Sequence, residues 1–114
     1  MAIMYNSNYD VTVPFSDVCF QLALAANVQQ HVTIPGDFNN RYAVRFEYND
    51  TSNVFARMDA AAVVPPGGTL TSVPYQEFRP GQDGSQRYAT GGQTISFITP
   101  DATAYVGVSL RSLP

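Results

Sequence analysis

The stretch RYAVRFEY, residues Arg41–Tyr48, decides the fold that the sequence predicts. Its large apolar side chains stand at every second position: Tyr42, Val44, Phe46 and Tyr48. The positions between them are small or charged: Arg41, Ala43, Arg45 and Glu47. Because successive side chains of a strand point to opposite faces, this alternation predicts a strand with one buried face and one solvated face.

Similar short alternating segments extend on both sides of this strand. Cys19–Asn27 places Phe20, Leu22, Leu24 and Ala26 on one face at a period of two, although Leu and Ala also favour a helix there. After a polar turn at Asn49–Asn53, Val54–Asp59 is expected to return beside Arg41–Tyr48 as a hairpin. Further extended segments are predicted at Val11–Phe15, His31–Gly36, Ala60–Val64, Thr69–Val73, Tyr75–Arg79, Gln86–Ala89, Gln93–Thr99 and Thr103–Leu113. Turn residues recur about every ten positions, and eight or nine such strands predict an all-β antiparallel sandwich or barrel.

The chain length of 114 residues fits one domain. We assign residues 11–114 to the β-sandwich and residues 1–10 to an N-terminal arm. Met1–Asn8 is polar, with neither strand alternation nor a helix cap, and its large apolar residues are Ile3, Met4 and Tyr5. The arm is expected to be loose or to lie on a partner.

Charge is scarce, and its distribution argues against two classes of partner. The six cations are all arginine, nine acidic residues give a net charge of -3, and only 13% of residues are charged. A nucleic-acid-binding domain normally carries a basic face, and a membrane-surface helix a Lys/Arg-rich amphipathic run; neither pattern is present. The uncharged polar surface suits a subunit that packs against neighbours. A neutral soluble domain would have the same composition, so both interpretations stay open.

Reactive side chains are too few to predict a catalytic or metal site. A zinc or iron site needs two or three histidines at fixed positions, and His31 is the one histidine. A phosphate-binding loop needs a lysine, which the chain lacks. The acids that could form a carboxylate pair are scattered: Asp37, Glu47, Asp59 and Glu77. We therefore predict no catalytic residue, no metal and no cofactor, and a protein that is not an enzyme.

Cys19 is the single cysteine, so no intrachain disulfide can form. It lies in the apolar run Val18–Phe20 and is expected to be a small buried hydrophobe. The start of the chain has no basic, long apolar segment, so no signal peptide is predicted, and a reducing cytoplasm is expected as the place of synthesis.

Three aromatic residues in the turn-rich region allow more than one function. Tyr75, Phe78 and Tyr88 could cover the edge of the sandwich, stack against sugar rings, or anchor a protein interface. Arg79 and Arg87 flank the same loop and could form bidentate contacts.

Two longer stretches resemble a known family. The first is NVQQHVTIPG, residues Asn27–Gly36, followed by the strand Arg41–Tyr48. The second is ISFITP, Ile95–Pro100, running into DATAYVGVSL, Asp101–Leu110. In these stretches the chain is similar to the small jelly-roll decoration proteins, also called cement or staple proteins, on the heads of tailed bacteriophages.

The resemblance implies a jelly-roll sandwich without catalytic residues, located on the virion surface after assembly in the host cytoplasm. It implies binding to the major capsid protein, bridging of neighbouring capsid subunits, and assembly into homo-dimers or trimers. The contacts that we expect are the arm residues Ile3, Met4 and Tyr5 and the loop residues Tyr75, Phe78 and Arg79. The alternative is a carbohydrate-binding or adhesion sandwich, such as a fibre or receptor-binding module, with a glycan as partner.

Overall fold

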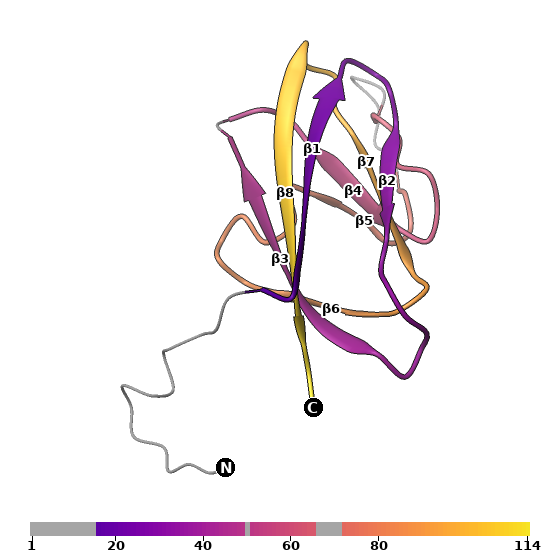
Figure 1. The fold of residues 1–114 in the computed structure, drawn as a ribbon. Coiled ribbons are helices and arrows are strands. Elements are labelled where there is room, and N and C mark those ends of the chain that lie inside the picture. Colours follow the sequence, from indigo (N-terminus) through magenta and orange to yellow (C-terminus); the bar gives the residue numbers. More distant parts are fainter. Residues whose placement is uncertain (1–15, 50, 66–71) are drawn as a thin grey trace.

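A computed structural model describes residues 16–49, 51–65 and 72–114 of the chain (Figure 1). These residues form eight strands and no helix: β1 (Val18–Ala25), β2 (Gln30–Thr33), β3 (Arg41–Tyr48), β4 (Phe55–Met58), β5 (Gln76–Phe78), β6 (Arg87–Thr90), β7 (Thr94–Ile98) and β8 (Thr103–Ser112). The predicted arm at residues 1–10 and the predicted strand Val11–Phe15 lie outside the described residues, as does the first part of Thr69–Val73.

The strands form two four-stranded sheets, with the orders β1-β8-β3-β6 and β2-β7-β4-β5. All strand pairs are antiparallel. The predicted all-β antiparallel sandwich is thereby confirmed. The short Leu/Ala-rich segment that could also have been a helix is the strand β1.

The pairing is nested along the chain. The first strand pairs with the last, β2 with β7, β3 with β6, and β4 with β5. The edge strands are therefore β1 and β6 in one sheet and β2 and β5 in the other. Side-chain contacts connect β5 with β6 and β2 with β1, so each edge of one sheet lies by an edge of the other.

The core lies between the two sheets and is built from the inward faces of the strands. Phe97 on β7 is fully buried and packs edge-on against Phe46 on β3, with 6.1 Å between the ring centroids. The other large apolar side chains that are fully buried are Leu24, Ile34, Val44, Val54, Val106, Val108 and Leu110. On the last strand, Val106, Val108 and Leu110 point inward.

The predicted hairpin between β3 and β4 is wrong. Val54–Asp59 does not return beside Arg41–Tyr48, because β4 lies in the opposite sheet between β7 and β5. Asn53 fixes this crossing: its N–H donates to Asp101 Oδ2 at 2.6 Å and its carbonyl accepts from Thr99 Oγ1 at 2.7 Å. The sequence pattern predicted a strand here, but alternation contains no information on which strand becomes its neighbour.

The predicted burial of Cys19 is also wrong. Its side chain is exposed, because Phe20 and Leu22 occupy the inward face of β1 and Cys19 therefore points outward. In a sandwich only one face of an edge strand reaches the core, so an apolar run does not ensure burial of each residue in it.

Strand β7 departs from the expected alternation, because it is buried on both faces. Ser96 and Ile98 are buried together with Ile95 and Phe97. The segment Ala60–Val64 forms no strand and instead covers the outer face, where Ala62 N–H donates to Ser96 Oγ at 2.9 Å. Gln29 donates to the same oxygen at 2.8 Å.

We expect Phe97→Ala to lower the free energy of unfolding by about 3–5 kcal/mol, because it removes a buried ring and leaves a cavity between the sheets. Urea unfolding followed by circular dichroism measures the change. Phe38→Ala is the control, since the Phe38 side chain is 76% exposed. Equal stability losses in the two variants would contradict the assignment of the core.

Candidate functional site

The open side of the sandwich, where β5 and β6 face each other, carries the candidate site. These two edge strands are joined by the loop 79–86 and belong to different sheets. Tyr75 and Tyr88 stand here with 81% and 58% of their surfaces exposed. Phe78 is also exposed and packs against Phe55, with 5.3 Å between the ring centroids. Of the expected contacts Tyr75 and Phe78, Tyr75 lines the cavity described below and Phe78 does not.

A cavity of about 210 Å³ opens between the sheets on this side. Its inner wall is apolar and comes from both sheets: Val44, Phe46, Ala56, Met58 and Ile95. Its rim is formed by Arg57, Tyr75, Glu77, Pro80, Arg87 and Tyr88. Since β5 and β6 belong to different sheets and do not pair, a hollow is left between these two edges.

The structure buries the side chain of Arg79, one of the three loop contacts that we expected. Its side chain is buried, with the guanidinium carbon 4.6 Å from the centroid of the Tyr48 ring. Its Nη1 donates to the carbonyl of Ser52, and its backbone N–H donates to Val54 O at 2.8 Å. Arg79 therefore holds the loop against the sandwich.

Both ends of β5 are bent by residues in the left-handed backbone region. Tyr75 has φ = 62° and Arg79 has φ = 44°, and neither is glycine. Such conformations are unfavourable for residues with a side chain and persist where surrounding contacts impose them. The carbonyl of Tyr75 accepts from Met58 N–H at 3.1 Å, and this contact holds the backbone on which the exposed ring stands.

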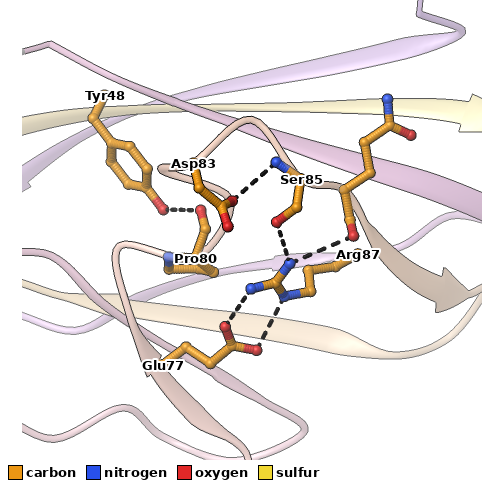
Figure 2. A network of polar contacts seen from close by, with 7 residues as sticks. Tyr48, Glu77, Pro80, Asp83, Ser85 and Arg87 are labelled. Carbon is orange, nitrogen blue, oxygen red and sulfur yellow. Dashed lines mark hydrogen bonds and ion pairs between the residues drawn. The ribbon is translucent and has the colours of Figure 1, made fainter.

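Tyr48 supports the loop from below. Its hydroxyl donates to the carbonyl of Pro80 at 2.7 Å (Figure 2). Burial raises the pKa of the Tyr48 hydroxyl above its ordinary value, and the nearby Arg79 charge only partly opposes this effect. The hydroxyl therefore keeps its proton and its hydrogen bond at neutral pH.

An ion pair bridges the open side. Arg87 on β6 holds Glu77 on β5 by two contacts, Nη2 to Oε1 at 2.6 Å and Nε to Oε2 at 3.1 Å (Figure 2). Arg87 Nη1 also donates to Ser85 Oγ at 2.7 Å, and Asp83 Oδ1 accepts from Ser85 N–H at 3.0 Å. The hydrogen bonds from Arg87 hold the pKa of Glu77 below its ordinary value. We call Glu77 and Arg87 the edge clip, because they connect the edges of the two sheets.

The remaining expected contacts, Ile3, Met4 and Tyr5, lie outside the described residues. Sequence analysis did not find the roles of Tyr48, Glu77 and Arg87 in shaping the site. Opposite charges ten positions apart on either side of a turn were a usable signal for the edge clip. The sequence contains no comparable signal for Tyr48, because its position in the alternating strand predicts an ordinary core residue.

Comparisons with protein-family models, with curated proteins and with solved structures found no match in any of the three. The resemblance to decoration proteins therefore rests on the stretches quoted above.

The described residues were also searched for metal-binding groups and membrane spans. They contain no cluster of three or more His, Cys, Asp or Glu side chains suited to a metal ion. None of them belongs to a helix that is long and apolar enough to cross a membrane.

The edge clip should make stability depend on pH. Because the folded-state pKa of Glu77 is lowered, the stabilisation is present above the ordinary glutamate pKa and is lost as the pH falls through the lowered value. We expect Glu77→Gln to be about 0.5–1 kcal/mol less stable than wild type at pH 7, a small value because both groups are partly exposed.

Urea unfolding of the two proteins at pH 7 and at pH 3 measures this difference. The curves should converge at the lower pH. Gln82→Glu in the same loop is the control for a change of charge outside the clip. A difference that stays constant over this range would show that the ion pair contributes nothing.

Proposed function

We propose that this protein is a structural protein that binds the outside of a tailed-phage capsid and clamps neighbouring major capsid subunits, thereby stabilising the expanded head. The observation that carries the proposal is the open side of the sandwich, where exposed Tyr75 and Tyr88 line an apolar cavity. Exposed aromatic side chains next to an apolar hollow are typical of protein interfaces.

The strand order supports a jelly-roll assignment. Eight strands in two sheets, with the first pairing with the last and each inner pair nested within the next, follow the course of one long hairpin rolled into a sandwich. Jelly rolls serve as viral capsid and lectin domains, but the same fold has other uses. The proposed partner therefore depends on the open side rather than on the fold.

The cavity suits a single apolar side chain of a partner protein. Its volume of about 210 Å³ fits one aliphatic or aromatic side chain. Contact would come from the exposed rings of Tyr75 and Tyr88 and from the partly buried Met58. The edge clip and the buried Arg79 hold the rim in place before binding. A rim that is already ordered loses little conformational entropy on association.

Binding to a repeated lattice explains how a modest interface can be sufficient. A protein that binds only the expanded shell stabilises that state by RT ln(1 + [L]/Kd) at each site. If the protein is a dimer or trimer, as the resemblance implies, two linked sites gain further through their effective concentration.

We expect Tyr75→Ala to weaken binding to expanded heads by roughly 10–30-fold, because a tyrosine at the centre of an interface typically contributes about 1.4–2 kcal/mol. Co-sedimentation of the purified protein with expanded heads of the same phage measures the affinity. Phe38→Ala is the matched control, since it removes an exposed ring that is not part of the cavity. Equal binding by wild type, Tyr75→Ala and Phe38→Ala would show that the open side does not contact the capsid.

The N-terminal contact is a separate prediction. Deleting Met1–Asn8 should reduce occupancy of expanded heads, because the deletion removes Ile3, Met4 and Tyr5. Gel densitometry of washed heads measures the number of bound copies. Unchanged occupancy would exclude the arm as a capsid contact.

A carbohydrate-binding or adhesion function is the second candidate, favoured by the same exposed tyrosines beside a carboxylate and a guanidinium. Glu77 and Arg87 line the cavity together with Tyr75 and Tyr88, and such groups can bind hydroxyls while the rings stack on a sugar. Glycan-array binding that is lost in Tyr75→Ala, without sedimentation with heads, would support this candidate over the first.

A further inference from the structure

We propose that β1 pairs with β1 of a second copy of this chain, antiparallel about a two-fold axis, and thereby joins two four-stranded sheets into one sheet of eight strands. The surface concerned lies at the edge of the sheet opposite to β6. This inference concerns the isolated protein and does not depend on the proposed partner.

The four edge strands of the sandwich differ in how well they are protected against such pairing. β5 has three residues, while β2 and β6 have four each, and β6 begins with Arg87 of the edge clip. β1 has eight residues, VCFQLALA, without a charge or a proline. Short length, charge and proline are the usual devices that keep sheet edges from associating, and β1 has none of them.

The hydrogen bonds show which backbone groups of β1 face outward. Gln30 Nε2 donates to the carbonyl of Ala23 at 2.8 Å, so this carbonyl points away from β8 and toward the edge. Backbone groups of alternate residues in a strand point to opposite sides. The N–H and C=O groups of Cys19 and Gln21 therefore point to the same edge as those of Ala23, and no described strand pairs with β1 on this side.

These groups select one symmetric register. With the axis at Phe20, Cys19 pairs with the partner's Gln21, and Ala23 keeps its bond to Gln30. An axis at Gln21 would place Cys19 opposite the partner's Ala23, whose carbonyl already accepts from Gln30. An axis at Cys19 would pair Gln21 with the partner's Asp17, whose N–H is already directed to Leu110 O at 2.7 Å.

The side chains of this register are compatible with a second copy. Val18, Phe20 and Leu22 pack against the core but are only partly buried. Across the axis, Phe20 meets the partner's Phe20, and Val18 meets the partner's Leu22. Since β1 carries no charge, an isologous contact opposes no like charges within the strand. One strand pair with three side chains from each copy is smaller than stable interfaces of about 1,200 Å² or more, so we expect a dimer that dissociates on dilution.

The first test is sedimentation equilibrium of the full chain over a range of concentrations. Wild type should move from monomer to dimer as the concentration rises, while Gln21→Lys should stay monomeric, because lysine on an edge opposes strand pairing. Gln82→Lys is the control for added charge, since Gln82 is exposed in the loop 79–86. A wild type that is monomeric up to about 1 mM, or a dimer that persists in Gln21→Lys, would overturn the proposal.

The second test is a crosslink that reports the register. In the proposed pair the Cα atoms of Cys19 and the partner's residue 21 lie about 5.5 Å apart, within the range for a disulfide. Gln21→Cys should therefore give a covalent dimer under mild oxidation, joined to the native Cys19. Ala25→Cys is the matched control on the same exposed face, because position 25 meets no cysteine in this register. Equal crosslinking of both variants, or none in Gln21→Cys, would contradict the register.

Discussion

Burial of one face of each sheet against the other is the constraint on which the rest of the structure depends. The apolar residues at every second position of β3 and β8 meet Phe97 and Ile95 of β7 in a single core. Short and long strands all contribute side chains to that core. The nested pairing allows this while every strand has antiparallel neighbours. The same arrangement leaves four edge strands, two on each side of the sandwich, and these edges are where the molecule can interact with others.

The edge strands make different contacts on the two sides of the sandwich. On the β5–β6 side, the edge clip and the contact of Arg79 with Tyr48 connect the sheets, while a small cavity stays open to solvent. On the β1–β2 side, Gln30 caps the carbonyl of Ala23, and no described strand pairs with the outer edge of β1. The first side offers aromatic rings and a hollow, whereas the second offers backbone hydrogen bonds. The two surfaces therefore suit different kinds of partner.

Period-two alternation was sufficient to predict an all-β sandwich and the strand Arg41–Tyr48, because burial of one face is a local property of a strand. It was not sufficient to place β4, because the neighbour of a strand is decided by contacts far along the chain, such as that of Asn53 with Asp101. The site was predicted only in part. Tyr75 and Phe78 could be chosen because turn-rich segments lie on the surface. The burial of Arg79 could not be foreseen, because it depends on the position of the Tyr48 ring in another strand.

The two proposed contacts are compatible in space, and their combination has a geometric consequence. β1 and β6 are the outer strands of one sheet, with β8 and β3 between them. Pairing through β1 would therefore leave the open side of each copy free, at opposite edges of the joined sheet. Seven steps between adjacent strands of about 4.8 Å separate the two β6 strands by at most roughly 34 Å. A dimer of this form would present two identical aromatic surfaces at a fixed spacing, which is what a protein needs in order to hold two neighbouring subunits of a lattice together.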